Sequence, residues 1–360
     1  MQQSMRTLVS AAALTVLMLP LTAQTNTQTA TASTNSSTLE QPAQPTPPPR
    51  ADEITESERV RLIFAAVENG DTRMTDTLAN NSVYYRHNDQ GETALTQAIL
   101  QEDVDMVRLL CRKAVINLKN EAGETPLTLA IKQGHTEIIA LVMQRAKAAL
   151  KNDLDETPLW LAIENGDLFI AQKLIDKGAR VNHLSKGETP VFQALRTRQL
   201  DMLALLIKND ADPSRTNIDQ EIPLFWAVRD KQYDMARILL NRSQQPYEDA
   251  NWKNQIGQPL LTRAVEQNQY DMVKLLIEYG AQVNTTDHLD NTPLHTAAKL
   301  GYSPLADLLI SSGADPASLN MLGETARDIA AHEGHQDVLN LFSVREKGGK
   351  SSFAASYDKQ

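Results

Sequence analysis

One multi-residue pattern recurs along these 360 residues at nearly constant spacing, and it constrains the fold more than any other feature. Clear copies read GETPLTLAI from Gly123, DETPLWLAI from Asp155 and DNTPLHTAA from Asp290. One position of the pattern is filled, at steps of 32, 32, 32, 33, 37, 33 and 33 residues, by Thr93, Thr125, Thr157, Thr189, Ile222, Pro259, Thr292 and Thr325. A ninth, earlier unit starts near Arg61, 32 residues before Thr93. Such a period predicts stacked supersecondary units that share one core.

Each unit is predicted to contain two helices. In the unit of Thr125, that residue is a good N-cap and Pro126 suits the first helical position. Gly134 can end the first helix in the left-handed conformation. Apolar residues recur at helical spacing in both halves: Leu127, Ala130 and Ile131, then Ile138, Ile139, Leu141 and Val142.

The best copy, DNTPLHTAAKLGYSPLADLLISSGADPASL from Asp290, resembles the ankyrin repeat, and the resemblance covers residues 54–343. The copy has the Thr-Pro-Leu-His, the paired alanines, the glycine and the final Gly-Ala-Asp of that family. The resemblance implies an all-α solenoid of about nine helix-turn-helix units with short β-hairpin-like tips. It also implies a protein partner, bound on a concave surface made of the tips and the first helices.

The first residues are typical of a segment that directs export. Arg6 precedes an apolar run from Leu8 to Leu21, and Ala23 is a small residue before a polar stretch. We expect a signal peptide over residues 1–23, with an uncleaved membrane anchor as the alternative. Residues 24–53, rich in Thr, Ser, Gln and Pro, are expected to be a disordered linker, and residues 344–360 a flexible tail. The expected location is the bacterial periplasm or the extracellular medium.

Charge and cysteine content narrow the function further. The formal net charge is −10, which disfavours nucleic-acid binding and suits a protein partner with a basic patch. Cys111 is the only cysteine, so an intrachain disulfide is excluded. It takes the place of Met143 and Ile175 in the following units, which predicts a buried, inert thiol.

No arrangement of residues predicts catalysis, a metal or a cofactor. His332 and His335 read HEGH, which is not the HExxH of zinc proteases, and Gly334-His335 fills the same turn position as Gly134-His135. The GGKSS that starts at Gly348 lacks the first glycine of a phosphate-binding loop. We therefore expect no catalytic, metal-binding or cofactor-binding residues.

A glutamate precedes the threonine position in six units. Five of these units are consecutive, and stacking is expected to align their glutamates as an acidic ladder: Glu92, Glu124, Glu156, Glu188 and Glu221. The sixth, Glu324, is in the last unit. Two interpretations remain open. A carboxylate beside a helix N-terminus stabilises that helix by about 0.3–1 kcal/mol, and an aligned series also attracts a basic partner.

Aromatic residues cluster in the middle units. Trp160, Phe192 and Phe225 fill the position of His295 in three consecutive units, and Trp226 follows directly. Packing between the first helices is one interpretation, and an exposed aromatic that anchors a partner is the other.

The sixth unit is four residues longer than the 33-residue copies and reads NRSQQPYEDANWK between Leu240 and Asn254. The extra residues are expected to leave the solenoid as a loop. Tyr247 and Trp252 make this segment partly apolar, so it is either a neutral insertion or part of a binding site.

These features together predict a non-enzymatic module that binds or protects a partner protein in the cell envelope. Units four to six, with their aromatic residues, glutamates and long loop, are the expected docking site. The alternatives are a secreted effector or inhibitor that acts on a foreign protein and, more distantly, a periplasmic enzyme whose site the sequence does not reveal. We expect a monomer without a membrane span once the signal peptide is removed.

Overall fold

The computed structural model describes residues 54–78 and 83–346. The expected signal peptide and linker, and residues 347–360 of the expected tail, lie outside these ranges. Residues 344–346 were assigned to the tail but continue the last helix instead.

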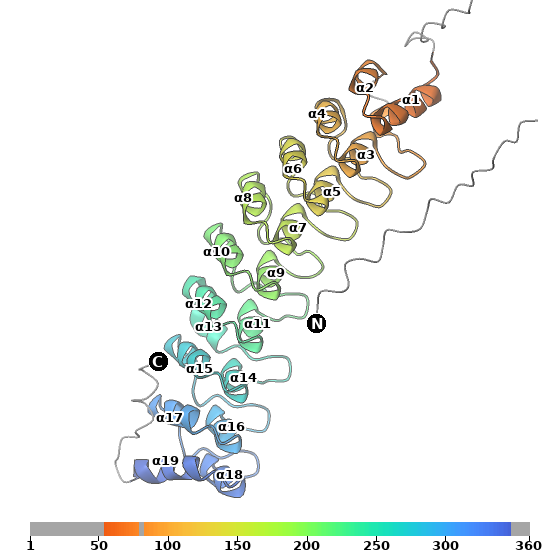
Figure 1. Ribbon diagram of the computed structural model, residues 1–360. Helices are drawn as coiled ribbons and strands as arrows, with labels where there is room; N and C mark the ends of the chain where they lie inside the picture. The colour runs from red at the N-terminus through yellow and green to blue at the C-terminus, as the bar shows by residue number, and fades with distance from the viewer. Residues whose placement is uncertain (1–53, 79–82, 347–360) are drawn as a thin grey trace, which may run out of the picture. The chain divides into compact units, whose positions relative to one another are not determined.

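Nine helix pairs follow one another along the described residues, and each pair is one unit (Figure 1). The first helices of units one to nine are α1 Glu56–Glu68, α3 Ala94–Leu100, α5 Pro126–Gln133, α7 Pro158–Glu164, α9 Pro190–Arg196, α11 Pro223–Arg229, α14 Leu260–Glu266, α16 Pro293–Lys299 and α18 Ala326–His332. The second helices are α2 Thr72–Leu78, α4 Val104–Lys113, α6 Thr136–Met143, α8 Leu168–Asp176, α10 Leu200–Lys208, α12 Tyr233–Arg242, α15 Tyr270–Glu278, α17 Ser303–Ser311 and α19 Gln336–Glu346.

Two short helical segments lie outside this pairing: η1, Val83–Tyr85, and α13, Pro246–Ala250. The described residues contain no sheet, only isolated bridges that join Ser185 to Glu188 and Lys253 to Pro259 near the tips. The predicted all-α solenoid of helix-turn-helix units is therefore confirmed.

Threonine caps start most of the first helices. Thr125 accepts a hydrogen bond from the backbone N–H of Thr128, and the Thr128 side chain accepts one from the backbone N–H of Thr125. This reciprocal pair satisfies two N–H groups that the helix itself leaves unpaired. Gly134 ends α5 with a φ of 81°, in the left-handed region that was predicted for it.

The core is one continuous apolar cluster that runs through all nine units. First helices pack on first helices and second helices on second helices, as α5 does on α3 and α7, and α4 on α6. Alanines at the closest approach, Ala130, Ala162 and Ala194, are fully buried. A unit alone would leave both of its faces exposed, so each unit is stable only within the stack.

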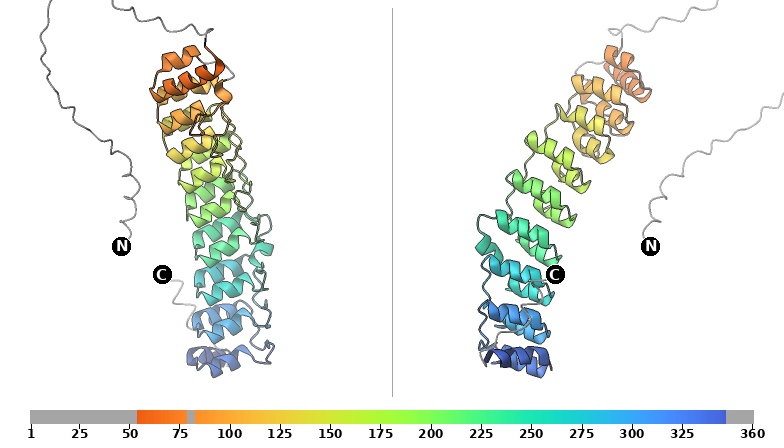
Figure 2. Two further views of the ribbon diagram at one scale, coloured as in Figure 1. Left: turned by 90° about the vertical axis from the view of Figure 1, so that its right-hand side faces the viewer. Right: turned by 60° about the vertical axis from the view of Figure 1, so that its left-hand side comes forward.

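The tip loops lie along one edge of the stack (Figure 2). Backbone hydrogen bonds join successive tips, from Asp153 N–H to the Gly123 carbonyl at 3.0 Å and from Ile218 N–H to the Gly187 carbonyl at 3.0 Å. Gly187 has a φ of 82°, and a Cβ there would lie 2.7 Å from Ile218 Cδ1, so this approach requires glycine. The tips and the first helices together form the face that presents side chains in register.

Candidate protein-interaction surface

The glutamates that precede the threonine position are aligned, and their carboxylates are used inside the stack. Glu92 accepts two hydrogen bonds from the amide of Asn120 in the next unit, each 3.0 Å long. Glu124 accepts in the same way from Asn152, at 3.2 and 3.1 Å. Glu92 and Glu124 therefore tie their own units to the ones that follow, and for these two residues the most direct role is to join units.

Lys132 bridges two of these glutamates. Its ammonium lies 2.6 Å from Glu124 Oε1 and 2.7 Å from Glu156 Oε2, and Lys186 approaches the other oxygen of Glu156 at 2.6 Å. Burial opposes the charge of Glu156, but hydrogen bonds from Lys132, Lys186 and Asn152 outweigh it and lower its pKa to about 2. The carboxylate is therefore held ionised by its neighbours, and little of its charge is left for a partner.

Glu188 fills the same position one unit later and has a different environment. It forms an ion pair with Arg196, while its Oε2 is buried without a hydrogen-bond partner among the described residues. Burial raises the pKa of Glu188, and the charges of Asp219 and Glu221 raise it further against the opposing effect of Arg196. This carboxylate is thus the least well satisfied member of the series.

Trp226 lies at the centre of a cluster of side chains. Its indole N–H donates to Glu221 Oε2 at 2.6 Å, and its ring meets Phe192 edge to face with centroids 5.2 Å apart. The guanidinium groups of Arg229 and Arg196 lie 4.5 and 5.5 Å from the ring centroid. The residue is half-buried and its polar atom is occupied, so the cluster stabilises units five and six whether or not a partner touches it.

The other aromatic candidates differ in exposure. Trp160 and Phe192 are buried, at 3% and 0% exposure, so they pack between first helices and a partner docked on this surface would not reach them. Phe225 and Trp252 are half-buried and contact each other, with ring centroids 5.1 Å apart. Trp252 thus anchors the long segment of unit six to α11.

The long segment of unit six is not the loop that was expected, because residues 246–250 form helix α13. Asp249 is buried and holds it, accepting from the hydroxyls of Ser214 at 2.6 Å and Ser243 at 2.5 Å. Tyr247 is exposed on one side and packs over Gly280 on the other, and Gln282 donates to its hydroxyl at 2.6 Å. The four extra residues are therefore built into the stack rather than released from it.

Exposed aliphatic side chains at the tips were not singled out in the sequence. Ile218, Ile256 and Leu322 are 69%, 68% and 81% exposed, and they come from units six, seven and nine. With their counterparts they form what we call the tip row: Leu154, Ile218, Ile256, Leu289 and Leu322. In the sequence, each of these residues is a Leu or Ile three or four places before the threonine position, and this spacing could have identified the tip row. Units two and three differ, because they carry Gln90 and Ala122 there.

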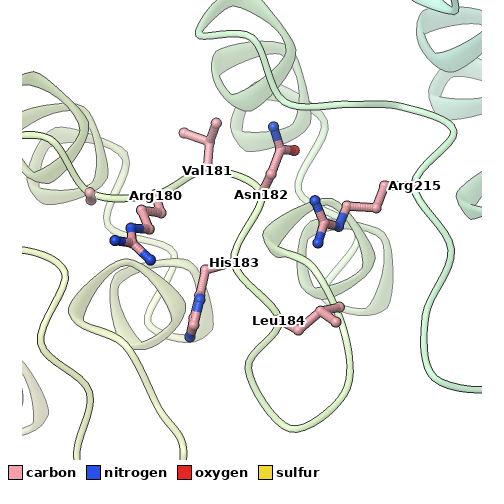
Figure 3. Close-up of a pocket in the computed structure, with 7 residues that line it drawn as sticks. Arg180, Val181, Asn182, His183, Leu184 and Arg215 are labelled. Carbon is pink, nitrogen blue, oxygen red and sulfur yellow. The ribbon is translucent and has the colours of Figure 1, made fainter.

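A hollow of about 630 Å³ lies by the loop that joins α8 to α9 (Figure 3). Arg180 and His183 belong to this loop, and Arg215 comes from the following loop. Asn182 joins the two loops, donating to the Asp210 carbonyl at 3.0 Å and accepting from Asp212 N–H at 2.8 Å. This hollow is basic and differs from the tip row, so it does not extend the apolar surface.

Groups with chemical reactivity are few in the described part of the chain. Cys111 is buried, and burial raises the pKa of its thiol to about 11 against the opposing charge of Arg145, so the predicted buried thiol is confirmed. His335 contacts the Lys299 carbonyl through Nε2 at 2.9 Å, which is a contact between neighbouring units. Residues 54–78 and 83–346 contain no group of three or more His, Cys, Asp or Glu side chains placed to hold a metal ion.

None of the helices in residues 54–78 and 83–346 is both long enough and apolar enough to cross a membrane.

The family model described as ankyrin repeats (3 copies) matches residues 62–153, 140–217, 214–287 and 261–350. Protein phosphatase 1 regulatory subunit 27 of Mus musculus is 37% identical over 86 residues, which are 24% of this chain and 55% of that protein. The B-cell lymphoma 3 protein homolog of Mus musculus is 36% identical over 100 residues, which are 28% of this chain and 20% of that protein.

An enzyme is also among the relatives. The intracellular phospholipase A2 of Caenorhabditis elegans is 31% identical over 112 residues, which are 29% of this chain and 10% of that protein. The matched segments thus span about half or less of each of these relatives.

Proposed function

Because this chain belongs to the ankyrin-repeat family, whose repeats mediate protein–protein interaction, we propose that it is a non-enzymatic module that holds or protects a partner protein in the cell envelope. The partner docks on the tips and the first helices. The name of one relative, a regulatory subunit of protein phosphatase 1, describes a protein that acts through another protein.

The tip row is the observation that carries this proposal. It places exposed Leu or Ile side chains on one edge in units four, six, seven, eight and nine, and the tips of units eight and nine are joined by a backbone hydrogen bond from Met321 N–H to the Leu289 carbonyl at 3.0 Å. Apolar side chains that recur along a rigid edge are costly to keep in water and mark a surface that another protein covers. Their spacing also suits an extended contact across several units.

The internal pairing of the polar groups supports a role in binding rather than catalysis. Glu124 and Glu156 are held by Lys132, and Glu221 by Trp226. Carboxylates fixed in this way strengthen the stack and are poorly placed to exchange protons with a substrate. The net charge of −10 favours a partner with a basic patch.

The proposed location rests on the first residues of the chain. Arg6, the apolar run Leu8–Leu21 and Ala23 have the order of charge, apolar core and small residue that directs export. The same export signal would serve a secreted effector or inhibitor of a foreign protein, which is the alternative function. Detection of the mature protein in washed envelope fractions supports the first role, and its recovery from the medium alone supports the second.

The test is affinity capture from the native host with the full chain. Wild type is compared with Ile218→Ser/Ile256→Ser, which changes two tips, and with Phe169→Ser, which removes an exposed aromatic from the second helix α8. We expect the tip variant to lose at least about 90% of the captured partner, as for central apolar contacts, and the α8 variant to retain it. Equal capture by all three folded proteins would contradict the proposal.

A further inference from the structure

The first-helix face opens into a groove at one end of the stack. A hollow of about 920 Å³ lies between α16 and α18 and the tips of units eight and nine, and we call it the C-terminal groove. Its apolar wall includes Leu289, Leu300 and Leu322, all of which are exposed. It is thus continuous with the last part of the tip row.

The same face is filled in units three, five and six. The position seven residues after the threonine slot carries Lys132, Arg196 and Arg229, whose long side chains lie against the glutamates or over Trp226. In unit nine this position is His332, which is exposed and lines the groove. The corresponding hollow at the other end, between α1 and α3, is about 440 Å³, and its tip carries Asp89 and Gln90 in place of aliphatic residues.

The C-terminal groove is also acidic. Four carboxylates line it, against one lysine, Lys299: Glu266, Asp287, Glu324 and Glu333. Residues 287–346 hold nine Asp and Glu against three Lys and Arg, a net charge of −6 within a chain of net charge −10. More than half of the net negative charge of the chain therefore belongs to the last two units, which form the C-terminal groove.

We propose that the C-terminal groove is the primary docking site of the partner, and that it binds a segment carrying basic residues beside apolar side chains. This inference rests on the proposed function and narrows it. The apolar side chains of the segment lie between Leu289 and Leu322, and its ammonium or guanidinium groups lie against Glu324 and Glu333. An acidic rim around an apolar floor favours this chemistry and rejects acidic segments by repulsion.

The test uses the purified full chain and three labelled peptides: one of Lys and Leu in helical repeat, one with Ser for Leu, and one with Glu for Lys. Fluorescence anisotropy gives each dissociation constant. Leu322→Ser and Glu333→Lys alter the groove, while Leu168→Ser on α8 and Glu164→Lys make the same changes in unit four, outside the tip row. All four side chains are exposed, so the variants are expected to fold.

We expect binding of the Lys/Leu peptide, weaker by about tenfold in each groove variant and within about twofold of wild type in each unit-four control. The Ser and Glu peptides should bind far more weakly. Equal losses in the groove variants and the unit-four controls, undiminished binding of the Lys/Ser peptide, or no binding of the Lys/Leu peptide would overturn the inference. If the tip variants lose the captured partner while Leu322→Ser and Glu333→Lys keep it, the proposed function stands and this site is wrong.

Discussion

At the scale of single residues, position in the repeat does not determine environment. Glu156 and Glu188 occupy the same place in adjacent units, yet the pKa of the first is lowered to about 2 and that of the second is raised. The difference lies in the neighbours, because two lysines and an asparagine reach Glu156 while Glu188 has one arginine and a buried, unpaired oxygen. These two residues form a natural pair for measuring what the ladder contributes.

Glu156→Gln should lower the free energy of unfolding at neutral pH by about 1–3 kcal/mol, since it leaves hydrogen-bond donors without their charged acceptor. A depressed pKa contributes stability above the ordinary value of 4.5, and that stability is lost as the pH falls from there towards about 2. The difference between wild type and variant should therefore shrink over this range. Urea unfolding at several pH values measures it.

Glu188→Gln is the matched control and should behave in the opposite way. A raised pKa makes the folded wild type gain stability as the pH falls from neutral through that pKa. The variant should be at least as stable as wild type at neutral pH, and its relative advantage should decline on acidification. Parallel pH profiles for the two variants would show that the described contacts do not set these pKa values.

Trp226→Ala should lower the free energy of unfolding by about 2–4 kcal/mol, because it removes a ring packed on Phe192 and covered by Arg229. Trp226→Phe keeps the ring contact and removes only the donor to Glu221, so about 1 kcal/mol is expected. Urea unfolding compares the two. An unchanged unfolding midpoint in the alanine variant would show that Trp226 does not stabilise the stack, and would favour a role in anchoring a partner.

The sequence predicted these residues unevenly. Alignment of the glutamates and burial of Cys111 follow from the period alone. The ion pairs required a further step: Lys132 and Arg196 come eight residues after Glu124 and Glu188, directly after the last apolar residue of the first helix. Whether an aromatic is buried or half-exposed depends on the neighbouring unit, which a one-dimensional pattern does not show.

At the scale of elements, α13 shows how a stack absorbs an insertion. Four extra residues in unit six become one helical turn that is bonded to Ser214 in the preceding loop and packed over Gly280 of the following unit. The length of unit six predicted that four residues must depart from the regular path of the repeat. One hydroxyl partner of Asp249, Ser243, lies in the same segment, but the other, Ser214, is 35 residues earlier and could not be inferred from the pattern.

Asp249→Ala should free α13 without unfolding the stack. Two hydroxyls lose their acceptor, so amide hydrogen exchange in residues 246–252 should be faster while α11 and α14 stay protected. Glu248→Ala, next to it and exposed, is the control and should leave exchange unchanged. Slow exchange in α13 of the Asp249 variant would mean that the packing of Tyr247 and Trp252 holds this helix by itself.

At the scale of the repeat domain, the period of the sequence was sufficient to predict nine helix pairs and one shared core, because stacking forces every unit to present the same apolar faces. The location of the binding surface was not predictable in the same way. The sequence predicted a docking site in units four to six partly from Trp160, Phe192 and Glu156, but the stack buries these three side chains. The aliphatic tips are ordinary residues, and only their shared exposure distinguishes them.

Site-specific photocross-linking in intact cells shows directly whether a partner protein covers the tip edge. A photoreactive amino acid is placed at Ile256 and Leu322 on the tips, and at Phe169 on α8, all of which are exposed. We predict cross-links to the same protein from both tip positions, strongest at Leu322, and none to that protein from Phe169. Cross-links from Phe169 with none from either tip would contradict this prediction.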